Sequence, residues 1–254
     1  VVQPNESGGA GKLSSLAGQF GGIASLAGIK LGANDSSDAV IAMEVMQSWG
    51  FAEEFISRHD LAVPLFGAIG WEPSTNTLRL DEDLYNSQKK QWIREAPKGK
   101  TVQPTSWELY QVFKERVRVE QSAETGLVTV SVIHYSPQIA KKWVDLLLED
   151  INHYMKNRAL DETQRNIEYL EQQFKNTSYA ELRAVFSELI QEEHKSKMLA
   201  QVSDEYIFKT ISKAKVPEER HKPNRAVIAI VGTLLGGFLS LLFILSLGLI
   251  RYKD

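Results

Sequence analysis

The stretch Tyr135-Ser136-Pro137-Gln138-Ile139-Ala140 opens the segment that decides the fold of this chain of 254 residues. Ser136 is a good helix N-cap, and Pro137 suits the first helical position, where its missing N–H is not needed. The helical pattern persists from here to Phe174, which predicts a helix of roughly 57 Å. Its first half carries a wide apolar stripe and its second half a narrow one, so we expect the helix to leave the core and project outward.

The residues after this helix predict a second helix that returns along it. Asn176-Thr177 interrupts the helical pattern, and Ser178 with Glu181 fits a capping box for the next helix. Residues 136–203 should therefore form an antiparallel helical arm. The apolar residues that should pack the two helices together, called the arm seam below, are Ile167, Leu170, Phe174, Leu182, Val185, Phe186 and Leu189.

Residues 1–135 predict an α/β base domain, in which a β-hairpin is the clearest signal. Arg116–Gln121 and Leu127–His134 alternate valines with polar residues on the two sides of a short loop that ends in Gly126. This alternation with a glycine-containing loop is typical of two antiparallel strands.

The sequence of the rest of the base predicts mostly helices. Apolar residues recur at helical spacing over Asp38–Arg58, and Leu84–Glu95 fits a second, more polar helix. Thr105 and Glu108 form a capping-box pattern at the start of a short helix. The glycine-rich residues 7–32 are interpreted as an apolar loop that orders against a neighbour or a membrane surface, the alternative being a plain flexible surface loop.

Residues 204–225 predict a returning strand and a linker. Pro217, Arg220 and Pro223 are spaced three apart, which favours an extended polyproline-type strut. Residues 226–250 then contain no ionisable side chain. As a helix they would reach roughly 37 Å, more than the ~30 Å hydrocarbon thickness of a bilayer, so the sequence predicts a C-terminal transmembrane helix.

Small residues recur along this predicted span. Gly232, Gly236 and Ser240 fall on one helix face, a pattern that lets another membrane helix approach closely. The alternative is that glycine is simply common in membrane spans. The basic residues on either side of the span leave the side of the membrane that holds the base open. Because the chain begins at Val1 rather than Met, we expect that an upstream piece is missing.

Composition and motifs give little sign of chemistry. The chain is 43% hydrophobic and 24% charged with a net charge of −3, which speaks against nucleic acid as a partner. It has no cysteine, so disulfides and thiolate sites are excluded. Gly8–Lys12 lacks the residues that a phosphate loop needs, and the five histidines show no metal-ligand spacing. We expect no catalytic residues, no cofactor and no metal site.

The order of hairpin, projecting arm, returning strand, proline linker and terminal span resembles the polysaccharide co-polymerases, the Wzz-type chain-length determinants of bacterial surface polysaccharides. The likeness is carried by the Tyr135–Ala140 helix opening, by Tyr169-Leu170-Glu171-Gln172-Gln173 and by Tyr206-Ile207-Phe208-Lys209. The glycine-rich region and Trp71-Glu72 are similar as well. Family members usually have a proline where this linker has Arg220. They also begin with a first transmembrane helix and first strand, which we expect this chain to lack.

The resemblance implies an α+β fold with a membrane-proximal α/β base, a long protruding antiparallel helical hairpin and the C-terminal transmembrane helix of residues 226–250. It implies a kinase-free, non-enzymatic regulator of the modal chain length of lipopolysaccharide O-antigen or a related polymer. Such a protein forms a homo-oligomeric ring at the inner membrane, with its bulk in the periplasm, and works with an integral-membrane polysaccharide polymerase and its lipid-linked substrate. Alternatives are a capsule or exopolysaccharide export adaptor of the same superfamily and a membrane-anchored sensory domain.

Overall fold

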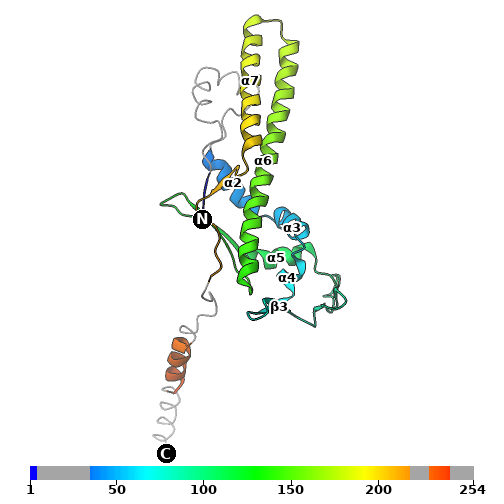
Figure 1. The fold of residues 1–254 in the computed structure, drawn as a ribbon, viewed down its shortest axis with the longest axis vertical. Coiled ribbons are helices and arrows are strands. Elements are labelled where there is room, and N and C mark those ends of the chain that lie inside the picture. Colours follow the sequence, from blue (N-terminus) through cyan, green and yellow to red (C-terminus); the bar gives the residue numbers. More distant parts are fainter. Residues whose placement is uncertain (5–34, 218–228, 241–254) are drawn as a thin grey trace, which may run out of the picture. The chain divides into compact units, whose positions relative to one another are not determined.

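Helix α6, Pro137–Asn176, runs for 40 residues through both the base and the arm (Figure 1). Its start is as predicted: Ser136 Oγ accepts the N–H of Ile139 at 3.3 Å, and a proline stands in the first turn. Its end at Thr177 also agrees with the predicted break. One helix therefore connects the two main parts of the fold.

The computed structural model describes residues 1–4, 35–217 and 229–240. The chain divides into two compact units, Val1–Val216 and Pro217–Asp254, which are treated separately here. The elements of the first unit, in chain order, are β1 (Val2–Pro4), α2 (Asp35–Gln47), α3 (Trp49–Arg58), α4 (Ala62–Phe66), β2 (Ala68–Glu72), β3 (Thr77–Leu80), β4 (Tyr85–Asn86), β5 (Gln91–Trp92), α5 (Ser106–Arg116), β6 (Val117–Gln121), β7 (Val128–Val132), α6, α7 (Ala180–Val202) and β8 (Phe208–Thr210).

The main sheet has four antiparallel strands in the order β6-β7-β1-β8. Strands β6 and β7 confirm the predicted hairpin, with Val119 opposite Val130. Strand β1 was not anticipated from the sequence: Val2 lies opposite Val128 on one side and Thr210 on the other. The segment that returns from the arm is therefore joined to the hairpin through the first described residues.

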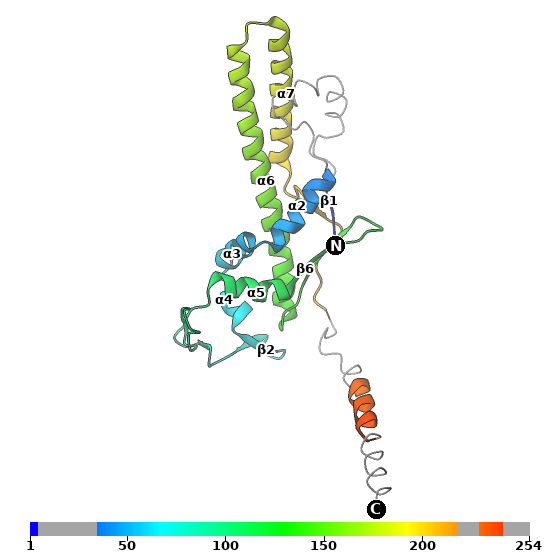
Figure 2. The ribbon, with the colours of Figure 1, turned by 180° about the vertical axis from the view of Figure 1, so that it is seen from behind.

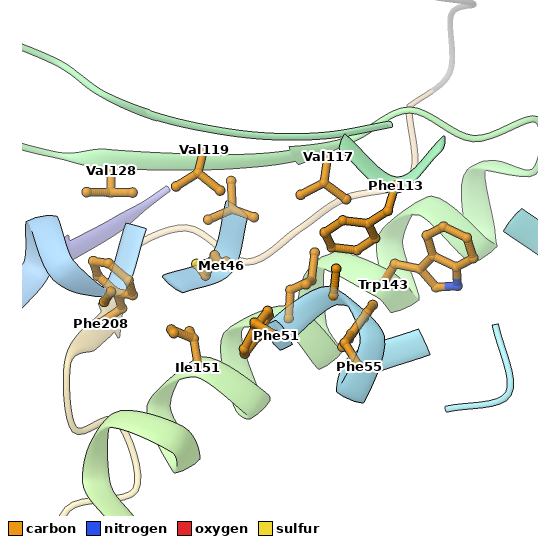
Figure 3. Packing of buried hydrophobic residues seen from close by; sticks show 14 of the residues in the cluster. Met46, Phe51, Phe55, Phe113, Val117, Val119, Val128, Trp143, Ile151 and Phe208 are labelled. Atoms are coloured by element: carbon orange, nitrogen blue, oxygen red, sulfur yellow. The ribbon is translucent and has the colours of Figure 1, made fainter. Parts of the chain in front are cut away.

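The core lies between this sheet and the base helices. Figure 3 shows Val117, Val119 and Val128 facing side chains of α2, α5 and α6. Trp143 and Phe113 are almost fully buried there, and the Phe113 ring lies 5.8 Å from that of Phe55. Each such side chain stabilises the fold by about 1.5–3 kcal/mol through burial.

Two segments differ from the sequence prediction. Asp38–Arg58 is not one helix, because the side chain of Ser48 caps a new helix, α3, at that point. Leu84–Glu95 is not helical either, since it holds the paired strands β4 and β5, in which the rings of Tyr85 and Trp92 meet edge to face at 5.1 Å. In both cases a local cap or a cross-strand contact outweighs the helical spacing of apolar residues.

A buried ion pair holds the loop after β5 to helix α5. Arg94 is 7% exposed and donates to both carboxylate oxygens of Glu108, at 3.0 and 2.8 Å. It also donates to the carbonyls of Thr101 and Val102. Glu108 closes the predicted capping box with Thr105, and its pKa lies far below the usual value, chiefly because Arg94 donates to it. All of these groups are satisfied, as a buried charge requires.

The returning chain is fixed to α6 by one buried amide. Asn152 is 5% exposed, and its Oδ1 accepts the backbone N–H groups of Ile207 at 2.8 Å and Phe208 at 2.9 Å. Its Nδ2 donates to the carbonyls of Phe208 at 3.2 Å and Leu148 at 2.9 Å. The Asn152 side chain thus bonds to the backbone groups at the start of β8 that point toward α6.

The predicted transmembrane helix is wrong. In the part of the chain that the structure describes, no helix is long and apolar enough to cross a membrane. Of residues 226–250, those at 229–240 are described and helical, and they extend only roughly 18 Å, against ~30 Å of hydrocarbon. This finding contradicts the C-terminal transmembrane helix in the predicted fold class. It also contradicts the predicted location, which was the inner membrane with the bulk of the chain in the periplasm.

His134 connects the start of α6 to helix α4. Its Nδ1 accepts the N–H of Ser136 at 3.1 Å, so the proton of the neutral ring is on Nε2, which donates to the carbonyl of Pro64 at 3.0 Å. Burial lowers the pKa of this imidazole. Protonation of Nδ1 would also remove the acceptor for Ser136.

We predict that Asn152→Leu destabilises the base by about 2–4 kcal/mol, because two buried N–H groups lose their acceptor. Urea denaturation followed by circular dichroism measures the change. Gln172→Leu, at an exposed position of the same helix, is the matched control and should change the free energy of unfolding by less than about 0.5 kcal/mol. Equal stabilities of the two variants would contradict the role given to Asn152.

We also predict a loss of stability in mild acid that depends on His134. Since its folded pKa is lowered, the unfolded chain binds the proton more readily, so stability is full above the unfolded pKa of about 6.5 and falls as pH drops from there toward the folded pKa. In His134→Gln this pH dependence should shrink when the free energy of unfolding is measured against pH. His194→Gln, on an exposed stretch of α7, should retain the wild-type slope.

Candidate functional site

The arm is formed by the outer part of α6 and by α7, which lie side by side in both views (Figures 1 and 2). The antiparallel hairpin predicted from the sequence is therefore present. Its second helix begins at Ala180 with Tyr179 as N-cap, and no side chain caps it. The capping box predicted for Ser178 and Glu181 is wrong, because the helix starts one residue later than that box requires.

The arm seam is only partly covered within the chain. Ile167 and Leu170 are buried at 3% and 0% exposure. The other predicted seam residues are half-buried: Phe174, Leu182, Val185, Phe186 and Leu189. The structure thus places all seven along the two facing helices, but packing is complete only toward the base.

Polar side chains fix the register of the two arm helices. Asn166 Nδ2 donates to Glu193 Oε1 at 3.1 Å, and Lys197 Nζ donates to Gln164 Oε1 at 2.7 Å. Burial raises the pKa of Glu193, an effect that the bond from Asn166 partly offsets. Nearer the base, Lys156 donates to the carbonyls that end α7. These bonds hold the hairpin in one alignment where apolar packing is thin.

The arm tip carries an aromatic contact between its helices. The guanidinium carbon of Arg183 lies 4.7 Å from the ring centre of Phe174. Tyr179, in the connection, is 74% exposed. Such a cation–π contact covers one face of the Phe174 ring, and the ring as a whole stays half-buried.

A second apolar surface on the arm was missed in the sequence. Met198, Leu199 and Val202 lie at helical spacing near the end of α7 and are 59%, 47% and 84% exposed. We call these three residues the α7 apolar patch. Their positions do not continue the three- and four-residue spacing of the seam residues of α7. This departure from the spacing could have marked them in the sequence as a separate face.

The residues predicted for membrane-helix packing lie on the described helical residues 229–240 of the second unit. A Cβ added at Gly232 or Gly236 would meet nothing within 4 Å, and Ser240 Oγ donates to the carbonyl of Gly237 at 2.8 Å. Of the predicted linker, Pro217 is described and exposed, while Arg220 and Pro223 lie outside the described residues. The glycine-rich segment 7–32 lies outside them as well.

Neither catalytic geometry nor similarity to known proteins assigns a function. Among the described residues, no three His, Asp or Glu side chains gather so as to hold a metal ion. No protein-family model matches the chain, and a comparison with curated proteins finds no significant relative. The arm, with its half-covered seam and its apolar patch, is the feature from which a function can be argued.

Proposed function

We propose that this protein is a non-enzymatic scaffold that regulates the chain length of a bacterial surface polysaccharide, such as lipopolysaccharide O-antigen. In this proposal several copies assemble into a ring through their arms and act beside a polysaccharide polymerase. The resemblance of the sequence to the polysaccharide co-polymerases supports this function, and so does one structural observation. That observation is an arm whose apolar residues are only half covered within a single chain.

The exposed apolar area of the arm supports self-assembly. The outer seam residues are half-buried, and the α7 apolar patch adds three exposed side chains near the end of α7. Apolar area removed from water stabilises an interface by about 25 cal/mol per Å² before the cost of association is subtracted. Contiguous exposed apolar surface on a helix is typical of protein–protein contacts.

The polar contacts of the arm support a scaffold rather than a flexible tether. The bonds from Asn166 to Glu193 and from Lys197 to Gln164 tie α6 to α7 across the hairpin. Lys156 ties the end of α7 back to the base. A hairpin aligned in this way can present the same surface in every copy, which a closed symmetric assembly requires.

We predict that Met198→Glu combined with Leu199→Glu dissociates the assembly without unfolding the chain. Both side chains are exposed, so the new charges stay in water in the monomer and are desolvated only between copies. Sedimentation velocity of the purified full chain measures the change. Gln191→Glu, at an exposed polar position of α7, is the control and should sediment as wild type. A strictly monomeric wild type would contradict the proposal.

In the native host, deletion of the gene should broaden the length distribution of the surface polysaccharide. Gel electrophoresis of the extracted polymer would then show loss of the modal cluster of bands, and the wild-type gene should restore it. The dissociated double variant should restore it poorly, whereas Gln191→Glu should restore it fully. An unchanged modal cluster would overturn the proposal, and loss of all surface polymer would favour an export adaptor instead.

A further inference from the structure

A cleft of about 340 Å³ opens between α3 and the middle of α6. This volume is at the lower end of the range for small-molecule sites, roughly 300–1,000 Å³. The α6 residues that line it include Tyr154, Asn157, Arg158 and Arg165, which repeat at helical spacing on one face. None of them belongs to the arm seam or to the α7 apolar patch.

The cleft has a positioned aromatic wall. The ring of Tyr154 lines it and is 41% exposed. The ring of Phe51, from α3, stands edge-on against Tyr154 at 6.3 Å and is itself buried. A tyrosine that is fixed in this way and still open to solvent offers an apolar ring beside a polar hydroxyl.

The charges that line the cleft are of two kinds. Arg58 is already engaged, since it pairs with Glu54 and lies 3.2 Å from the buried carboxylate of Asp150. Asp150 also bonds to His59 at 2.9 Å, so the groups of this cluster are engaged with one another.

The other kind is available to a ligand. Arg158 and Arg165 form no ion pair within 4 Å in the part of the chain that the structure describes. Asp161 is the acidic residue of the lining between them, and the Asp38 carboxylate of α2, whose pKa burial raises, is close enough to Arg158 for the guanidinium to offset part of that rise. The lining as a whole carries as many arginines as carboxylates, but Arg158 and Arg165 are its two arginines without an ion pair among the described residues. Guanidinium groups suit planar, bidentate recognition of carboxylates.

We propose that this cleft binds an acidic sugar residue. The apolar face of the sugar ring packs on Tyr154, its carboxylate pairs with Arg158 and Arg165, and its hydroxyls exchange hydrogen bonds with Asn157 and Asp161. An aromatic wall beside planar amide, carboxylate and guanidinium groups fits a ring that carries both hydroxyls and one negative charge. That the sugar belongs to the regulated polymer rests on the proposed function; the binding itself does not.

Isothermal titration calorimetry of the purified full chain tests the cleft with two probes, hexagalacturonate and the neutral maltohexaose. We expect hexagalacturonate to bind and maltohexaose to bind at least about tenfold more weakly, because it lacks the carboxylates that form charge-assisted bonds. Binding of hexagalacturonate should weaken as salt is raised, as expected for a solvent-accessible charged site.

Variants separate this cleft from other surfaces. Arg158→Gln combined with Arg165→Gln, and separately Tyr154→Ala, should each weaken hexagalacturonate binding about tenfold or more, while Tyr154→Phe should retain it. Arg118→Gln, on the exposed side of β6, is the control and should bind as wild type. Circular dichroism confirms that each variant is folded.

The inference is overturned if wild type fails to bind hexagalacturonate at millimolar concentration, if both probes bind equally, or if the cleft variants bind as well as Arg118→Gln. These outcomes are independent of the polysaccharide gel. A chain that binds the acidic probe through the cleft but leaves the modal cluster unchanged on deletion would refute the proposed function alone.

Discussion

The side chain of Asn152 fixes the chain that returns from the arm to helix α6 of the base. A chain that leaves the core for a long excursion must return to a defined place, and here the returning backbone finds its partners on α6 itself. One amide accepts from two consecutive N–H groups and donates to Phe208 and to its own helix. Strand β8 is placed by these bonds, and β1 and the hairpin of β6 and β7 follow from β8 through the sheet. Buried amides have this organising effect because an unpaired polar group is costly.

Base and arm are stabilised in different ways. The base buries large aromatic residues such as Trp143 and Phe113, and it fixes its loops with satisfied charges such as Arg94 with Glu108. Any loop conformation that separates such a pair leaves a buried charge without a partner, which is costly. The pair therefore restricts the loop to the conformation in which both charges meet. The arm has a short apolar seam and polar cross-bonds, and much of its surface stays available. The base is thus stabilised by a buried core, and the arm by a short seam and polar bonds between its two helices.

Much of the architecture could be predicted from local signals. The N-cap at Ser136, the alternating valines of β6 and β7 and the break at Thr177 act within a few residues, so the sequence reveals them directly. Features that depend on distant partners could not be predicted in this way. Asn152 looks like an ordinary polar residue of a helix until Phe208 is placed beside it, and the cleft exists only because α3 packs near α6. The transmembrane helix was predicted wrongly for another reason. The apolar composition of residues 226–250 suggested one helix of that length, whereas the described helix covers residues 229–240, too short to cross a membrane.

The antiparallel pairing of β1 with β8 has a mechanical consequence. Val1 donates from its amino group to the carbonyl of Ser212 at 3.1 Å, so these two points of the chain meet at the same end of the two-stranded ladder. Tension between them would act across the strands and open the hydrogen bonds one after another, rather than shearing them together. A force applied between Val1 and Ser212 is therefore carried by one hydrogen-bonded pair at a time, beginning with the pair of Val2 and Thr210.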